Sequence, residues 1–291
     1  MYQTKFKGEI FEGIVELTKQ IASKILVGYV IFYGILMLIM SFLVMGLLKS
    51  TGFTMVDLQN PEAITELVES IVYGGINGKF LFGIIIFYLL MILVSCWHYY
   101  FSFKVAQNEV LNQPLSLGEA LANSLDNRLF QLLLFIILLG LGLFSLFTAI
   151  TAIFTLTGVP ALVFVGILIG LTISIKLCLA LPAFILGDKT MIEAVSFSFV
   201  NMTLIRVVKI IGVLFLVFIV FLLLALVVGI ISGLFSFIPY FDQVISFVFN
   251  ALIGGVVMAF MVAAATALYY RYSDNIDSGA LEIQDHLVDG F

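Results

Sequence analysis

Two polar side chains inside otherwise apolar stretches, Lys176 and Asn250, are the residues best placed to do chemistry in this chain. A charge such as that of Lys176 is costly within a membrane, so it often marks an ion, proton or headgroup site. The alternative is that Pro182 ends the helix early and Lys176 reaches the headgroups. Asn250 bonds either a neighbouring helix or a ligand. Together the two residues would form an intramembrane polar site.

The remaining reactive side chains fit neither catalysis nor a cofactor. The apolar runs contain no nucleophile–base pair, no set of metal ligands and no pair of carboxylates. We expect Cys96 and Cys178 to be small core residues and His98 to lie at the membrane interface. The thirteen Lys and Arg form no basic run, which argues against nucleic-acid binding. We therefore expect no enzyme activity, no metal and no cofactor.

The composition places these residues in a membrane protein. Hydrophobic residues make up 63% of the 291 residues, charged residues only 11%, and the mean hydropathy is +1.22. A soluble domain would be about half apolar and about a quarter charged. The sequence predicts an all-α bundle of transmembrane helices, which need about 20 apolar residues each. Six stretches qualify: 25–48, 80–103, 129–154, 161–186, 207–238 and 244–270.

The basic residues between these stretches predict the orientation. Two of them, Lys49 and Lys79, fall on one side, and Lys176 lies within a stretch. The other ten fall on the opposite side: Lys5, Lys7, Lys19, Lys24, Lys104, Arg128, Lys189, Arg206, Lys209 and Arg271. Basic residues concentrate in cytoplasmic segments. We expect a multi-pass protein of the bacterial cytoplasmic (inner) membrane with both termini in the cytoplasm.

Two segments on the predicted cytoplasmic side resemble each other. Each has Ser or Thr followed three residues later by Glu, the spacing of a capping box at a helix start. A serine follows five residues after each Glu. The two sets are Ser116, Glu119 and Ser124, and Thr190, Glu193 and Ser198.

A weaker third copy at residues 7–13 completes a predicted three-fold repeat. Its apolar residues, from Ile10 to Ile21, recur at helical spacing, which predicts a helix lying in the membrane surface with its apolar side down. Each unit would be one cytoplasmic surface helix and two spans, at about 6–107, 114–186 and 188–272. The alternative is that any helix entering a membrane favours a capped start.

Glycines four apart occur in two predicted spans, at Gly166 and Gly170 and at Gly229 and Gly233. Such pairs let helices approach closely, either within the bundle or in a homo-oligomer. Segment 60–73 predicts an external amphipathic helix whose three Glu either face solvent or bind a cation. The acidic residues 273–291 predict a mobile cytoplasmic tail, with partner docking as the alternative.

One longer stretch carries a family resemblance. Residues 181–198, Leu-Pro-Ala-Phe-Ile-Leu-Gly-Asp-Lys-Thr-Met-Ile-Glu-Ala-Val-Ser-Phe-Ser, resemble the membrane domain of bacterial glycerophosphodiester phosphodiesterases and YciC-like integral membrane proteins. Residues 112–120 and 8–10 resemble the corresponding earlier copies. The resemblance implies a six-helix membrane domain and carries no catalytic residue with it, since catalysis in the phosphodiesterases belongs to a separate soluble domain. Residues 199–202 depart from it, because family members often carry basic residues there.

Two functions remain open on the sequence alone. The first is a non-catalytic scaffold or accessory to a membrane complex or to an envelope or lipid process. The second is a small transporter or lipid-handling protein built around Lys176 and Asn250. Membrane lipids are the expected surroundings, with a membrane-protein partner or a second copy as further partners.

Overall fold

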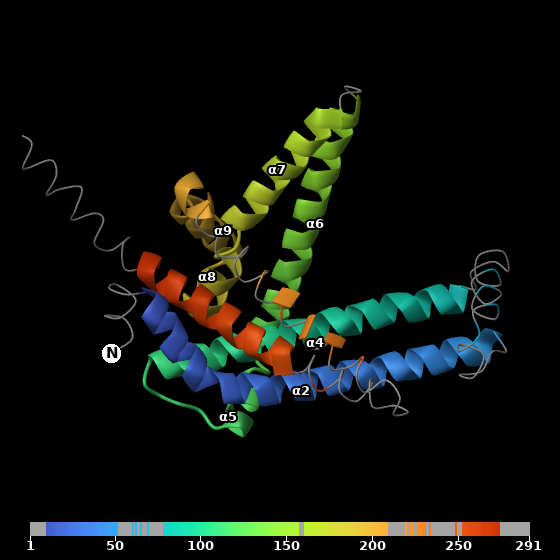
Figure 1. Ribbon diagram of the computed structural model, residues 1–291. Coiled ribbons are helices and arrows are strands. Elements are labelled where there is room, and N and C mark those ends of the chain that lie inside the picture. The colour runs from blue at the N-terminus through green and yellow to red at the C-terminus, as the bar shows by residue number, and fades with distance from the viewer. Residues whose placement is uncertain are drawn as a thin grey trace, which may run out of the picture.

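The protein is all-helical in the part that the structure describes. This computed structural model describes residues 10–51, 60, 62, 65, 69, 78–156, 160–208, 219, 222–223, 226–227, 229–230, 233, 248 and 252–273, and no strand occurs among them. The helices are α2 (Ile10–Thr51), α4 (Gly78–Val110), α5 (Leu117–Asn123), α6 (Asn127–Leu156), α7 (Pro160–Lys176), α8 (Ala180–Leu186) and α9 (Met191–Asn201), followed by helix Leu252–Ser273 (Figure 1).

Five helical segments of the described chain are long and apolar enough to cross a membrane. They are Ile10–Leu43, Ile85–Val110, Asn127–Leu156, Phe164–Leu186 and Leu252–Ser273. These segments match five of the six predicted spans and indicate a multi-pass membrane protein. The predicted fifth span, 207–238, lies largely outside the described residues, as do Asn250 and the tail 274–291.

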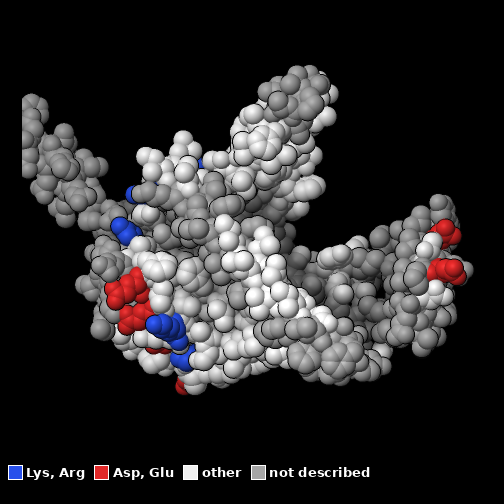
Figure 2. Space-filling view, viewed as in Figure 1, with Lys and Arg blue, Asp and Glu red and all other residues white. Residues whose placement is uncertain are grey.

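Four of the five spans form two helical hairpins that diverge from a common end, here called the base (Figure 1). Helix α2 pairs with α4, and α6 pairs with α7. The short helices α5, α8 and α9 lie at the base, near the ends of the spans. On the face seen in Figure 2, charged side chains gather near the base and at the far tip of the α2–α4 hairpin. Along their lengths, α2, α4, α6 and α7 expose large apolar side chains such as Phe42, Phe82, Phe144 and Phe164, as contact with lipid requires.

Small residues allow close packing within each hairpin. A Cβ atom added to Gly28 would lie 2.5 Å from Cε1 of Phe101, so α2 and α4 touch there. Phe154 and Phe147 of α6 fill the space over Gly166 and Gly170 of α7. In the structure this glycine pair therefore packs inside the hairpin. For Gly229 and Gly233, most of the surrounding chain lies outside the described residues, and their packing stays a prediction.

The first helix differs from its prediction. The expected surface helix and the first span form one continuous helix of 42 residues, about 63 Å long and so about twice the thickness of a hydrocarbon core. Its apolar stripe does not face a membrane surface, since Leu17 and Ile21 are fully buried. The reason is that α4 is also long and packs along it.

The predicted fourth span is interrupted. Helix α7 ends at Lys176, a turn follows at Leu177–Leu179, and α8 begins at Ala180. Pro182 lies in the first turn of α8. It has no N–H to donate to the carbonyl of Cys178, and its ring would clash with that carbonyl in a continuous helix. The break therefore precedes the proline instead of following it.

Helix Leu252–Ser273 brings the end of the described chain back to its beginning. A Cβ added to Gly255 would lie 2.5 Å from Cδ1 of Leu26, and the Tyr29 hydroxyl packs directly over Gly254. At the base, the ring of Tyr269 packs against Phe197 of α9, with the ring centroids 5.5 Å apart. Helix Leu252–Ser273 thus packs against both α2 and α9.

Candidate functional site

Both predicted capping boxes are present in the structure. The Ser116 N–H donates to Glu119 Oε2 at 2.9 Å, and the Glu119 N–H donates to Ser116 Oγ at 3.3 Å. The Thr190 N–H donates to Glu193 Oε2 at 2.8 Å, and the Glu193 N–H donates to Thr190 Oγ1 at 3.3 Å. Each capped helix follows a short loop containing a polar residue with positive φ, Asn112 or Asp188.

The hydrogen bonds of these boxes act on the two glutamates. Bonds from the Ser116 hydroxyl and backbone N–H lower the pKa of Glu119. Bonds from the Thr190 backbone N–H and hydroxyl lower the pKa of Glu193, and the nearby Lys189 acts in the same direction. Both carboxylates are consequently held in the charged form that a helix N-terminus stabilises.

The serine that follows each box is buried and joins its helix to the preceding span. Ser124 Oγ accepts the Trp97 indole N–H of α4 at 2.7 Å. Ser198 Oγ accepts the Leu179 N–H at 3.1 Å and donates to the Lys176 carbonyl at 2.6 Å. Ser198 thereby satisfies two backbone groups at the α7–α8 break, where the regular helical pattern is interrupted.

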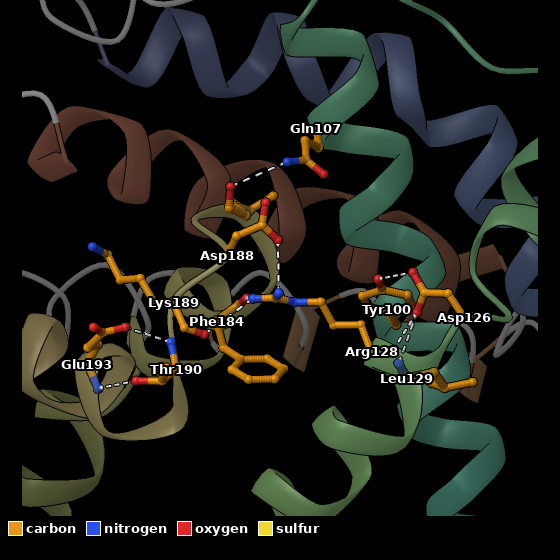
Figure 3. Close-up of polar contacts among 11 residues, drawn as sticks. Tyr100, Gln107, Asp126, Arg128, Leu129, Phe184, Asp188, Lys189, Thr190 and Glu193 are labelled. Carbon is orange, nitrogen blue, oxygen red and sulfur yellow. Dashed lines mark hydrogen bonds and ion pairs between the residues drawn. The ribbon is translucent and has the colours of Figure 1, made fainter.

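Arg128, at the start of α6, is the centre of the polar contacts at the base (Figure 3). Its Nη2 donates to the carbonyls of Phe184 at 2.8 Å and Lys189 at 3.2 Å, and its Nη1 lies 3.1 Å from Asp188 Oδ1. The guanidinium carbon is 4.9 Å from the centroid of the Phe184 ring. We call Arg128 and these three partners the Arg128 node.

The Arg128 node closes the end of α8. The last carbonyls of a helix have no partner within it and carry partial negative charge, so a cation there is favourable. Gln107 of α4 assists by donating from Nε2 to the Leu186 carbonyl at 3.3 Å. Side chains from two other spans therefore hold the loop between α8 and α9.

Asp126 positions Arg128 by capping α6. Its Oδ1 accepts the N–H groups of Arg128 at 2.9 Å and Leu129 at 3.1 Å. Its Oδ2 accepts the hydroxyl of Tyr100 at 2.8 Å, which ties the start of α6 to α4. An Asp just before an apolar run is a recognised helix-start signal, so the sequence contained a sign of this cap that we did not use.

The structure places Lys176 at the break between α7 and α8. The residue is the last of α7, its side chain is half-buried, and Nζ lies 5.4 Å from the centroid of the Phe199 ring on α9. Asn250 lies outside the described residues, so a site shared by the two stays a prediction. The ammonium group of Lys176 thus lies over an aromatic ring of α9.

His98 is 9% exposed and packs between the helices, against Tyr29 and Phe32 of α2, with ring centroids 5.4 and 5.0 Å away. Its place at the membrane interface stays a prediction. Cys96 is buried as expected, whereas Cys178 is exposed because it lies in the turn between α7 and α8.

One hollow at the base is lined mainly by polar side chains. It is an open groove of about 550 Å³ between the last turns of α4, the end of α5 and the cap of α6, and its polar lining is Lys104, Gln107, Asn108, Asn123 and Asp126. Sequence reasoning missed it because its residues come from three separate elements. Within the described residues, no group of three His, Cys, Asp or Glu could hold a metal ion.

Comparison with protein-family models, with curated proteins and with solved structures found no match. The geometry of the base therefore carries the functional argument.

Proposed function

We propose that this chain is a non-catalytic integral membrane protein of the bacterial inner membrane that scaffolds or assists a membrane complex or an envelope or lipid process. In this proposal it has six spans in three units, with both termini in the cytoplasm. The eight described residues between 219 and 233 are helical, which supports a further span there: 219, 222, 223, 226, 227, 229, 230 and 233. The resemblance of residues 181–198 to YciC-like membrane proteins agrees with this assignment.

The observation that carries the proposal is the use of polar side chains at the base. Arg128, Asp126 and Ser198 each bond backbone groups at helix ends. Groups engaged in this way hold helices in place and are not available to bind a solute on its way through a bundle. A base built on such contacts is suited to presenting a fixed surface to other membrane components.

A small transporter is the second candidate, because α7 and α8 form a discontinuous span. Interrupted helices line the substrate sites of many transporters. In this reading, Lys176 and Asn250 would line a polar path. The half-buried position of Lys176 at the interruption is the observation that favours it.

Cysteine accessibility distinguishes the two candidates. Lys176→Cys would be made in a background with Cys96→Ala and Cys178→Ala, and labelled in sealed vesicles of known orientation with a membrane-impermeant maleimide. The scaffold proposal predicts labelling from the cytoplasmic face only. Labelling of Lys176→Cys from both faces would contradict it and favour the transporter.

The mass of the protein extracted from its own membranes tests the scaffold directly. Native mass spectrometry of gently solubilised, tagged protein should show a defined assembly with other membrane proteins at fixed stoichiometry. A chain recovered only as a monomer, under conditions in which a known membrane complex stays intact, would contradict the proposal.

A further inference from the structure

The polar groove at the base contains a positively charged side chain, Lys104, that can bind a ligand. Lys104 lies on α4, and its Nζ is 5.4 Å from the centroid of the Tyr100 ring. Among the described residues, no carboxylate lies within ion-pairing distance of Lys104. Glu109, on the same helix, pairs instead with Lys24 of α2 at 3.6 Å. The ammonium group of Lys104 can therefore donate to an anionic ligand in the groove.

The one carboxylate that lines the groove is already engaged. Asp126 accepts two backbone N–H groups and the Tyr100 hydroxyl, and it lies at the N-terminus of α6, where its charge is favourable. Its repulsion of an anion is reduced accordingly. Asn123 is exposed in the groove and adds amide donors, and Gln107 uses one amide hydrogen on Leu186 and keeps a second.

Exposed apolar side chains occur near the groove. Leu111 lines it and is 48% exposed, and Leu125, next to Asp126, is 60% exposed. Phe130, in the first turns of α6, is also exposed. A polar groove with exposed apolar side chains around it, at the end of membrane spans, matches a molecule with a charged head and an apolar tail.

We propose that this groove binds the phosphate group of a phospholipid headgroup. Lys104 is the charged contact, Asn123 and Gln107 are neutral donors, and the acyl chains lie along Leu125 and Phe130. The same donors could hold a free phosphate ester, and the exposed Leu111, Leu125 and Phe130 favour the lipid. The site is independent of the proposed scaffold function and would exist in a transporter as well.

Trp97 provides the measurement. It is the only tryptophan of the chain, and its N–H bonds Ser124, the residue after Asn123. The full chain in a phosphate-free maltoside detergent would be titrated with dihexanoyl phosphatidylethanolamine while the Trp97 emission is recorded. Dihexanoyl glycerol and inorganic phosphate are the other two probes. Native mass spectrometry on the same samples counts bound lipid and gives a second Kd.

Saturable binding of the phospholipid, with weak or no binding of the other two probes, is the expected result. Lys104→Gln should raise the Kd for the phospholipid by about tenfold or more, since a hydrogen bond to a charged group contributes about 1.5–3 kcal/mol. Asn123→Ala should raise this Kd by a smaller factor. Lys189→Gln is the matched control, because Lys189 also lies over an aromatic ring, at 5.3 Å from Phe197, but outside the groove.

Three results would overturn the proposal. Equal binding of dihexanoyl glycerol would show that the phosphate is not recognised, and equal binding of inorganic phosphate would show that the site takes free phosphate. Unchanged binding in a Lys104→Gln protein with wild-type helix content would show that Lys104 is not the contact. Lys104 is half-buried and Asn123 is exposed, so both variants are compatible with folding.

Discussion

Helices α5 and α9 begin alike but follow spans that end differently. Each starts with a capping box, and each carries a buried serine five residues after the glutamate. The span before α5 is continuous, and Ser124 receives a side-chain N–H from Trp97. The span before α9 is broken, and Ser198 receives a backbone N–H from Leu179.

The difference shows what the serine does in each place. A hydroxyl can both accept and donate, so it suits either a side-chain partner or a broken backbone. Before α9 it bonds the Leu179 N–H and the Lys176 carbonyl, two backbone groups at the break that precedes Pro182. Before α5 it joins two intact helices. One position in the two similar segments therefore serves two structural purposes.

Removing Arg128, which connects the start of α6 to the loop between α8 and α9, should have the largest effect on stability. Arg128→Ala leaves the carbonyls of Phe184 and Lys189 without their donor and Asp188 without its ion pair. We expect a loss of about 3 kcal/mol in unfolding free energy, because these are hydrogen bonds to a charged group. Unfolding with SDS in mixed micelles measures it. Arg128→Lys should recover part of the loss, and a loss below about 1 kcal/mol in Arg128→Ala would show that the node contributes little.

Replacing Ser198 by alanine should lower the free energy of unfolding more than replacing Ser124 by alanine. Ser198→Ala leaves the Leu179 N–H buried and without a hydrogen-bond acceptor. Ser124→Ala leaves the Trp97 indole N–H without its acceptor, but that contact is only part-buried. Leaving a buried donor unpaired costs about 1–3 kcal/mol. We expect Ser198→Ala near the upper end of that range and Ser124→Ala near the lower end, by the same unfolding assay. Equal losses would mean that the helix break gives Ser198 no special role.

A double-mutant cycle of Ser198 and Pro182 tests whether the serine is needed because of the helix break. Pro182→Ala restores an N–H that can bond the Cys178 carbonyl and lets the helix continue through the break. Ser198→Ala should then cost less in the Pro182→Ala background than in the wild type, with a coupling energy of about 1 kcal/mol. Additive losses would show that the serine and the proline act separately.

The caps should have smaller and similar effects. Thr190→Ala and Ser116→Ala each remove the acceptor for a helix-start N–H, which costs about 0.5–1 kcal/mol at exposed sites. Similar losses in the two variants would support equivalent roles for α5 and α9. Thr190→Ser and Ser116→Thr, which keep the hydroxyl, serve as controls. A loss in only one of the alanine variants would break the equivalence.

Protonating Glu119 and Glu193 in acid should have the smallest effect on stability. Because their pKa values are lowered in the fold, Glu119 and Glu193 contribute stability that is full above the ordinary pKa and is lost as pH falls through the folded pKa. The melting temperature of the wild type should therefore fall more in acid than that of the Glu119→Gln, Glu193→Gln double variant. Identical acid profiles would show that the two carboxylates do not contribute.

Sequence reasoning succeeded where the signal was local. Hydropathy located five segments that match the helices able to cross a membrane. The spacing of Ser116 and Glu119, and of Thr190 and Glu193, located two helix starts. Both signals depend on residues close together in the chain, and the structure places them as expected.

It failed where distant residues decide the outcome. Arg128 bonds carbonyls 56 and 61 residues away, and no periodicity predicts such a partner. The α7–α8 break was misplaced because the apolar run is uniform and the proline acts on a carbonyl four residues before it. Helix α2 was divided in two because its burial depends on α4.

The contact of Tyr29 and Leu26 with Gly254 and Gly255 has a consequence for biogenesis. The first described helix must wait for this partner until the more than two hundred residues between them have been synthesised. At about 5–20 residues per second, that delay is on the order of ten seconds or more. Throughout it, the face of α2 around Leu26 and Tyr29 lacks its native cover, so an insertase or chaperone has time to reach it.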